Sequence, residues 1–586
     1  MPHKGTSHRR SGRTLPAGAA GRDASAAALV ALLAVCVARR VRGGFFAPDD
    51  LVVLESARGL LPPFPAPWRW LSGTVYPALA SAVFGLDPAG YLTVNLALHG
   101  ANAALLFVWS RTLGLDVPAA LLAAGLFAAS PLAFYPLHQM VGAGELMALG
   151  LTLDALIVIG RSGARQAIVA GFLFAAALLS KESVALLPAV LLLPAPDAGP
   201  LRARAQRASV LLSLSLVAGV VLVATGAARS AFGGSAYRAS LGTHMGSHLL
   251  LYASWAADYV HPSPGAVATM TWGTALAGAL VLSTMAFAAA WTWRSRGPGT
   301  IGLAWFLLGI GPVLPLVSQI QVGYVYTPLA GIAIAIAALA GHAAERFRWA
   351  QVATWAGAIA IITALALRAD ALAARRYDER APGSDSPMDP WLRKCASAEH
   401  VIADVGRGLG DGPVRVVMFL PPELQHVYSA RTSAEVAPQV TLGLPRYLLA
   451  REVTDDGRAL RLFHPDVTDV AWTDAWQESL TAGAWFLIGA GAHATALGRG
   501  LAAQANFARM ANDGGMPALA RRHLESVLRD QPGDARTRFE YGRALAALGE
   551  RDGARRELTR VLEMEPDPET ATLARDGLQQ LLPPRR

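Results

Sequence analysis

The chain has 586 residues, of which 53% are hydrophobic and only 16% are charged. Its mean hydropathy of +0.36 is too high for a water-soluble protein of this length and indicates a protein that crosses a membrane several times. The formal net charge is +9, but the arginines lie in short clusters between apolar segments. Membrane proteins place positive charge in this way on their cytoplasmic side, so the sequence does not indicate a nucleic-acid-binding face.

Apolar segments recur along residues 24–368, and their lengths predict about eleven membrane-spanning helices. Arginine is concentrated in the loops after the even-numbered spans, which places the N-terminus in the cytoplasm. An odd number of spans then exports everything after Arg368. The arginine-rich, lysine-poor composition is typical of GC-rich bacterial genes, so we expect a bacterial inner-membrane protein. The span centres are expected near Leu32, Ala101, Leu126, Leu151, Phe174, Val190, Leu216, Leu280, Leu308, Ala333 and Ile359.

Four further parts flank these spans. Residues 1–23 are a basic cytoplasmic N-terminus, and residues 369–394 have the charged, proline- and glycine-containing composition of a linker. Residues 395–500 show the pattern of a soluble, extracytoplasmic α/β domain. Residues 501–582 form a helical tail. Within the α/β domain we expect a helix at 398–409 and strands at 414–420, 446–453, 459–464 and 484–490.

The tail repeats itself with a period of 34 residues. HLESVLRDQP at 523–532 matches ELTRVLEMEP at 557–566, and a proline closes both segments. This period, with proline after the second helix of each unit, is typical of tetratricopeptide repeats. We expect the tail either to bind a peptide or partner protein or to cap the preceding domain.

Two adjacent carboxylates, Asp49 and Asp50, follow the first span in the segment APDDLVVLE. Pro-Asp-Asp is also ordinary turn chemistry, so the dipeptide alone does not separate a turn from a site. In this topology the pair lies at the outer membrane surface. There it is placed to act as a general base or to hold a divalent metal ion, with Asp49 as the candidate ligand. No other cofactor is indicated.

Charged side chains also stand at the boundaries of other spans. Lys181 and Glu182 lie between two apolar segments, where charges are costly unless they are paired or functional. Lys181 is a candidate contact for a phosphate group, and snorkelling at a span end is the alternative. A continuous helix would place His138 and Glu145 on one face, whereas solvation in an outer loop is equally compatible with the sequence.

Three histidines and an asparagine have simpler interpretations. His99 and Asn102 lie within an apolar span, where hydrogen bonds between helices are expected. His244 and His248 have a spacing that can bind zinc, but Gly246 lies between them and the glutamate of a protease motif is missing. We therefore do not expect zinc there.

Taken together, the segments resemble the transmembrane and tetratricopeptide-repeat-containing family, which is similar to protein O-mannosyltransferases and belongs to the GT-C superfamily of glycosyltransferases. The resemblance covers residues from about Phe45 to Ala330 and the tail. Their order and spacing are more specific than any one segment. They are APDDLVVLE, FGLDPAGYLTVNLALHGANAALLF, FAASPLAFYPLHQMVGAGELM, LLSKESVALLPAVLLL, LLLYASWAADYVHPSP and GYVYTPLAG.

The resemblance implies a GT-C hexosyltransferase that moves a sugar from a polyprenyl-phosphate donor to a hydroxyl of a periplasmic protein, glycan or lipid. Asp49 and Asp50 would supply the base, with Asp50 as the first candidate. The implied partners are the bilayer, the donor, the acceptor and a protein bound by the repeats, and no nucleic acid. The residues expected to bind the donor phosphate and the substrate are Lys181, Glu182, His138, Glu145, Tyr324 and Tyr326.

The chain departs from the family at three arginine positions, which hold Tyr76, Ala143 and Gly323. The departures leave a second hypothesis open, a catalytically inactive GT-C-like scaffold that recruits envelope proteins through its repeats. A transporter of the same lipids is a third, disfavoured because no charge lies clearly at a span centre and no inverted repeat is visible. The candidate substitutes for the missing arginines are Lys181, Arg58, Arg69, Arg229 and Arg238.

Overall fold

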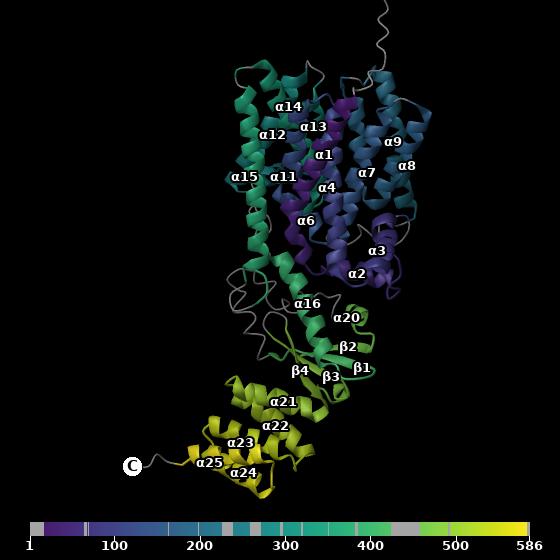
Figure 1. The fold of residues 1–586 in the computed structure, drawn as a ribbon. Coiled ribbons are helices and arrows are strands. Elements are labelled where there is room, and N and C mark those ends of the chain that lie inside the picture. The colour runs from purple at the N-terminus through teal and green to yellow at the C-terminus, as the bar shows by residue number, and fades with distance from the viewer. Residues whose placement is uncertain are drawn as a thin grey trace, which may run out of the picture. The chain divides into compact units, whose positions relative to one another are not determined.

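The computed structural model of the chain divides into two compact units (Figure 1). The first comprises Met1–Glu379 and Pro387–Leu392, and the second comprises Arg380–Ser386 and Arg393–Arg586. The structure describes residues 17–582 except 64–66, 68, 162, 197, 226–237, 258–270, 294–296, 318–319, 348, 350, 381–384, 423–456 and 490–492.

The first unit is a bundle of helices (Figure 1). Among its described residues, seven helical segments are long and apolar enough to cross a membrane, and the bent pair α5–α6 would make an eighth. The chain is therefore a multi-pass membrane protein. The helices are α1 (Ala17–Ala38), α2 (Pro48–Ala57), α3 (Tyr76–Phe84), α4 (Pro88–Thr112), α5 (Val117–Ala128), α6 (Phe134–Leu137), α7 (Ala143–Ile159), α8 (Ala164–Ser180), α9 (Leu201–Ala224), α11 (His244–Ala257), α12 (Trp272–Thr292), α13 (Pro298–Ile310), α14 (Tyr326–Arg346) and α15 (Gln351–Asp378).

The expected number of eleven spans is not confirmed, although every expected centre falls in a helical segment. Phe174 lies in α8, which has 17 residues, and Leu308 lies in α13, which has 13. Val190 lies in a 3-10 helix of six residues. These segments are shorter than the roughly 20 residues that cross a bilayer. α8 ends where the charged residue Lys181 begins, whereas Gly311 and Pro312 follow the end of α13.

Aspartate and proline set the starts of two long helices. The carboxylate of Asp87 caps α4 by accepting a hydrogen bond from the amide of Ala89 (3.0 Å). Asp116 caps α5 in the same way, through the amide of Ala119 (2.9 Å). Each helix also has proline in its first turn, where the missing N–H costs nothing. These local signals fix where the chain turns back into the bundle.

The expected hydrogen bonds between helices are present in the bundle core. His99 Nδ1 lies 2.9 Å from the hydroxyl of Tyr326 on α14. The Asn102 amide donates to the carbonyl of Leu146 on α7 (2.9 Å) and to the same tyrosine hydroxyl (3.2 Å). All of these side chains are buried, so the network joins α4, α7 and α14.

Helices α13 and α14 cross at a contact between two glycines. A Cβ atom at Gly331 would lie 2.4 Å from the carbonyl oxygen of Gly302 and 2.7 Å from the amide nitrogen of Phe306. A Cβ at Gly302 would meet the carbonyl oxygen of Gly331 at 2.5 Å. Small residues allow such close backbone approach in membrane bundles.

The second unit contains a four-stranded mixed sheet with the order β2-β1-β3-β4. β1 pairs in parallel with β2 and β3, and β4 is antiparallel to β3. This confirms the expected α/β character. The elements are α16 (Pro390–Gly408, which begins in the first unit), β1 (Val414–Phe419), α20 (Arg458–Phe463), β2 (Val467–Thr473), β3 (Ala484–Ile488) and β4 (Ala494–Arg499).

The secondary structure expected for this region is only partly correct. The helix at 398–409 and the strands at 414–420 and 484–490 correspond to α16, β1 and β3. The strand expected at 459–464 is wrong, because this segment is the helix α20, which packs on β2. The strand expected at 446–453 lies outside the described residues. Strands β2 and β4 were not expected.

Most of the expected linker at 369–394 is helical. α15 continues to Asp378, and α16 begins at Pro390. The charged sequence that suggested a linker therefore lies largely at the end of α15, where Arg376 is 7% exposed.

The tail forms paired helices with the predicted repeat. Leu524 and Leu558, which are one period apart, are both buried, on α22 and α24. Gly515 and Gly549 precede these helices with φ of +74° and +82°, a conformation that favours glycine. The helices are α21 (Gly500–Asp513), α22 (Pro517–Asp530), α23 (Ala535–Ala547), α24 (Arg551–Glu563) and α25 (Pro568–Gln580).

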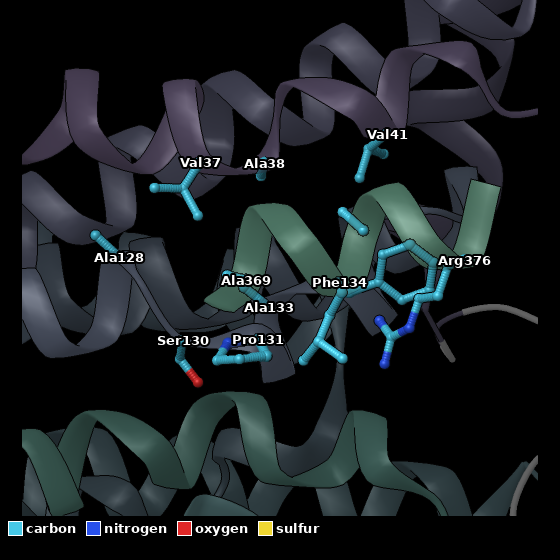
Figure 2. Close-up of a pocket in the computed structure, with 12 residues that line it drawn as sticks. Val37, Ala38, Val41, Ala128, Ser130, Pro131, Ala133, Phe134, Ala369 and Arg376 are labelled. Atoms are coloured by element: carbon cyan, nitrogen blue, oxygen red, sulfur yellow. The ribbon is translucent and has the colours of Figure 1, made fainter. Parts of the chain in front are cut away.

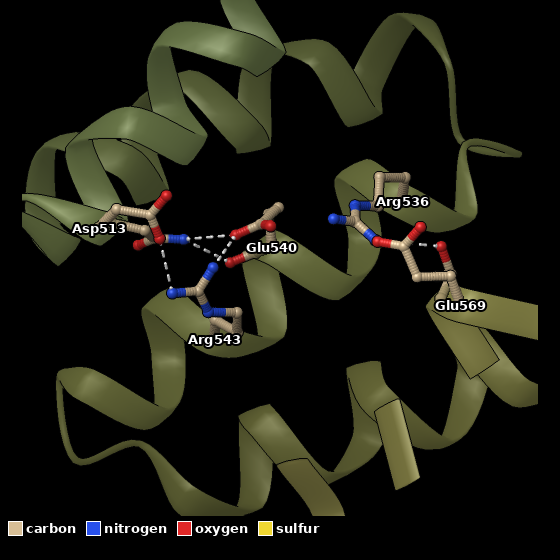
Figure 3. Close-up of polar contacts among 7 residues, drawn as sticks. Asp513, Arg536, Glu540, Arg543 and Glu569 are labelled. Atoms are coloured by element: carbon tan, nitrogen blue, oxygen red, sulfur yellow. Dashed lines mark hydrogen bonds and ion pairs between the residues drawn. The ribbon is translucent and has the colours of Figure 1, made fainter. Parts of the chain in front are cut away.

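Ion pairs link alternate helices of the tail (Figure 3). Arg543 of α23 lies between Asp513 of α21 and Glu540 of its own helix, at 2.9 Å from each carboxylate. Arg536 of α23 reaches Glu569 of α25 at 3.3 Å. Such partly exposed pairs add little stability individually, so the buried leucines and alanines hold the stack together.

The glycine contact between α13 and α14 gives a direct test of the bundle. We expect Gly331→Val to destabilise the protein by about 1–3 kcal/mol, because the side chain overlaps backbone atoms that cannot move independently. Thermal unfolding of the purified protein in detergent measures this. Gly219→Val is the matched control, since a Cβ at Gly219 meets nothing within 4 Å. Equal stability of the two variants would contradict the close crossing.

Candidate functional site

The carboxylate of Asp50 fastens the start of α2 to the turn that precedes α7. One oxygen accepts a hydrogen bond from the amide of Ala47 (2.9 Å), and the other accepts one from the amide of Val141 (2.8 Å). The side chain is only 1% exposed. Burial raises the pKa of the Asp50 carboxyl to about 7, although the two amides act in the opposite direction. Asp50 therefore joins two segments that are distant in the sequence.

Asp49 has a different environment from its neighbour. It lies in the first turn of α2 and is exposed. Negative charge is favourable at a helix N-terminus, and an exposed carboxylate remains available to a ligand. Among the described residues, Asp49 belongs to no group of three or more potential metal ligands. The pair thus consists of one buried and one accessible carboxylate.

Glu145 and Lys181 form an ion pair in which the glutamate is buried and the lysine is partly exposed. Lys181 Nζ lies 2.9 Å from Glu145 Oε2, and the two side chains are 22% and 3% exposed respectively. The hydroxyl of Thr327, at the start of α14, donates to the same carboxylate. Ser183 also donates to it, at 3.3 Å. The pair therefore joins the start of α7, the end of α8 and the start of α14.

A second ion pair lies next to the first along the chain. The Arg69 guanidinium donates two hydrogen bonds to the Glu182 carboxylate, from Nη2 to Oε1 (2.6 Å) and from Nε to Oε2 (3.1 Å). Arg69 has φ of +47°, which is uncommon for a residue with a side chain. A two-point arginine–carboxylate contact is geometrically specific. The strained backbone therefore occurs at a residue whose side chain makes a two-point contact with Glu182.

The π-helix Leu71–Val75 brings Arg69 to this place. The hydroxyl of Ser72 donates to the carbonyl of Ser180 at the end of α8 (2.6 Å). A Cβ at Gly144 would lie only 3.0 Å from the Ser72 hydroxyl oxygen. The absence of a side chain at Gly144 therefore allows the π-helix to approach α7 and α8. We call Arg69, Glu145, Lys181, Glu182 and Thr327 the charged cluster.

The other predicted site residues are placed elsewhere. His138 and Glu145 do not share a helix face, because α6 ends at Leu137 and a separate turn precedes α7. His138 is 1% exposed and stacks on the ring of Phe134. Tyr326 is a buried member of the core network, and Tyr324 lies half-buried on the 3-10 turn before α14.

Tyr76 and the arginines considered as phosphate contacts have the following surroundings. Tyr76 has a buried hydroxyl oxygen with no hydrogen-bond partner among the described residues. Arg238 is exposed near Val317, whose amide donates to its backbone carbonyl. Arg58 caps the end of α2 and is exposed. Arg229 lies outside the described residues.

The contacts of Thr327 and Ser183 with Glu145 were not predicted from the sequence, because hydroxyl residues beside a motif carry no signal of their own.

Arg376 was not predicted from the sequence either. Figure 2 shows it beside Phe134 at one end of a small pocket. The Arg376 guanidinium lies 4.1 Å from the Phe134 ring centre and 3.5 Å from the Asp389 carboxylate. The pocket between α1, α5–α6 and α15 has a volume of about 30 Å³. It has room for about two water molecules and is too small for a sugar.

Comparison with known proteins identifies the tail. Residues 511–576 match the tetratricopeptide repeat model, which confirms the prediction from the sequence period. No curated protein matches this chain. Among solved structures, the chain is similar to the archaeal oligosaccharyltransferase AglB from Archaeoglobus fulgidus, in complex with an inhibitory peptide and a dolichol-phosphate, with 12% identity and a TM-score of 0.39. The match covers 69% of this chain and 63% of the oligosaccharyltransferase, which is less than two thirds of its length.

The raised pKa of Asp50 predicts a pH dependence of stability. Because its folded-state pKa of about 7 lies above its ordinary value of 3.8, the folded protein binds this proton more tightly than the unfolded chain. The resulting stabilisation is complete below pH of about 4 and is lost as the pH rises through about 7. We expect the melting temperature of the wild type, relative to Asp50→Asn, to fall between pH 5 and pH 8.

Asp49→Asn is the matched control for this experiment, because it removes the adjacent but exposed carboxylate. It should retain the pH dependence of the wild type. Parallel profiles for the wild type and Asp50→Asn would contradict the raised pKa of Asp50.

The Glu145–Lys181 pair predicts strong coupling between its partners. Lys181→Met leaves the Glu145 carboxylate buried without its cation, which costs up to about 3–5 kcal/mol. We expect Glu145→Gln combined with Lys181→Met to recover most of this loss, because neither charge is then buried. Unfolding of the two single variants and the double variant in detergent measures the coupling. Additive losses would show that the two side chains do not interact.

Proposed function

We propose that the protein is a membrane glycosyltransferase of GT-C type that acts at the outer face of the bacterial inner membrane. Its donor would be a sugar linked to a polyprenyl phosphate, and its acceptor a hydroxyl of a protein, glycan or lipid. A carboxylate takes the proton of the acceptor hydroxyl as that oxygen bonds to the anomeric carbon of the sugar. The bond from this carbon to the phosphate oxygen breaks, and the polyprenyl phosphate leaves with the electron pair.

The observation that supports this proposal is the charged cluster. It combines two cations and two carboxylates from segments that are far apart in the sequence, at the ends of helices in a membrane bundle. Arg69, Glu182 and Lys181 remain 35%, 30% and 22% exposed, so a ligand can reach them. A leaving phosphate needs cations near it, and charges in a membrane protein mark functional sites by default.

We assign the base to Asp49 in preference to Asp50. Both oxygens of Asp50 accept hydrogen bonds from backbone amides, so that carboxylate is already occupied in holding α2. Asp49 is exposed beside it, at the N-terminus of the same helix. Asp50 then acts as a positioning residue. The repeat tail would hold the acceptor or a partner protein outside the membrane, which requires a cytoplasmic N-terminus and an odd number of spans.

The second candidate function is the inactive scaffold. It is favoured by the pairing of both cations of the charged cluster with carboxylates. Lys181 is paired with Glu145, and Arg69 is paired with Glu182. Cations that are neutralised by carboxylates bind a phosphate less strongly than free cations. A scaffold would need the membrane bundle only as an anchor for the repeat tail.

A transfer assay with purified protein, labelled polyprenyl-phosphate sugars and envelope extract as acceptor separates the two functions. We expect Asp49→Asn to lower the transfer rate by about 10²- to 10⁴-fold, the usual contribution of a general base. The amount of folded protein should stay unchanged, because Asp49 is exposed. Asp49→Asn with near-normal transfer would exclude Asp49 as the base. A well-folded wild type that transfers no sugar would favour the scaffold.

A further inference from the structure

Three potential metal ligands converge in the second unit. They are Asp385 in the segment before α16, His400 in α16 and His493 directly before β4. One ligand atom from each side chain lies within 4.8 Å of the ligand atoms of the other two. Two imidazoles and a carboxylate are a ligand set that zinc and similar divalent metals prefer.

A fourth residue, Asp404, fixes the orientation of His493. Its carboxylate accepts hydrogen bonds from His493 Nδ1 (2.9 Å) and from the amide of Ala494 (2.9 Å), and it also pairs with Arg407. Asp404 is only 9% exposed. A carboxylate that holds the N–H of a histidine in this way directs the other ring nitrogen towards a metal. The same relationship is typical of histidines that bind zinc.

The other nitrogen of that ring contacts a second carboxylate. His493 Nε2 lies 2.8 Å from Asp385 Oδ2. When Nε2 carries a proton, this contact is a hydrogen bond from the ring to the carboxylate. A divalent cation that takes the place of this proton would bind both atoms at once.

The third ligand is brought close by ring stacking. The rings of His400 and His493 lie with their centres 4.2 Å apart and their planes at 13°. In a tetrahedral zinc site with bonds of 2.0–2.1 Å, the ligand atoms are separated by about 3.4 Å. The separations here run from 2.8 Å to below 4.8 Å, so small side-chain movements suffice. Asp385 is 58% exposed and His493 39% exposed, which leaves room for water as the fourth ligand.

We propose that Asp385, His400 and His493 bind a divalent transition metal of the zinc type, with Asp404 as a positioning residue. The metal joins the segment that carries Asp385 to α16 and to the start of β4. Its role is to stabilise this part of the second unit. The proposal is independent of the glycosyltransferase activity.

The test uses the full-length protein, untagged and stripped of metal with a chelator. After dialysis against zinc chloride, we expect elemental analysis to find one zinc ion per chain and the melting temperature to rise, because a ligand that binds the folded state stabilises it. His400→Ala and Asp385→Asn should lose the zinc and the shift. Asp404→Asn should weaken zinc binding roughly 10- to 100-fold, as loss of an orienting carboxylate does.

His244→Ala is the control, because His244 belongs to the other pair of neighbouring histidines. It should bind zinc as the wild type does. Undiminished zinc binding by His400→Ala and Asp385→Asn, or loss of zinc in His244→Ala alone, would overturn the proposal. So would a wild type without stoichiometric zinc. Asp385→Asn changes an exposed residue outside the helices, so it provides the test even where His400→Ala fails to fold.

Discussion

The ion pair between the buried Glu145 and the partly exposed Lys181 is the constraint on which the end of the membrane bundle depends. A charge in an apolar bundle is costly unless it is paired, so the ends of α7 and α8 must meet. α8 stops at Ser180, and Lys181 continues in an extended conformation with φ of −161°, which directs the chain towards Glu182 and its partner Arg69. The hydroxyl of Thr327 adds the start of α14 to the same point. The short length of α8 and the irregular turns around it are therefore consequences of where the charges must lie.

Asp50 and Asp49 differ in role: Asp50 holds the backbone, whereas Asp49 is exposed. The sequence alone does not distinguish these roles. Asp50 satisfies the amides of Ala47 and Val141, which ties α2 to the same end of α7 that carries Glu145. Asp49 stays exposed on the helix that its neighbour holds. A variant of Asp50 therefore alters the scaffold as well as any chemistry, and its loss of activity by itself would not identify a base. The proposed site keeps its reactive carboxylate accessible by burying the one next to it.

The sequence predicted those features that depend on local periodicity. The 34-residue repeat places Leu524 and Leu558 in equivalent buried positions, and the tail matches the tetratricopeptide repeat that this period predicts. Residues 459–464 form a helix instead of the expected strand, because a short apolar run does not distinguish the two. The proposed metal site left no motif, since Asp385, His400 and His493 come from separate segments that only the fold of the second unit brings together. The sequence likewise does not predict which charged residues of the bundle pair with each other, because the partners come from distant segments. It does show that Lys181 and Glu145 are charged residues at the boundaries of apolar spans.

Stabilisation by a ligand would show whether the charged cluster binds a lipid-linked phosphate. The melting temperature of the full-length protein would be measured in detergent with increasing polyprenyl-phosphate sugar, and in parallel with the uncharged polyprenol. A ligand that binds only the folded state raises the stability with the logarithm of its concentration once the site is saturated. We expect the melting temperature to rise with the phosphate-linked sugar and to stay unchanged with polyprenol. Equal responses to the two lipids, or no response to either, would show that the charged cluster does not bind the phosphate.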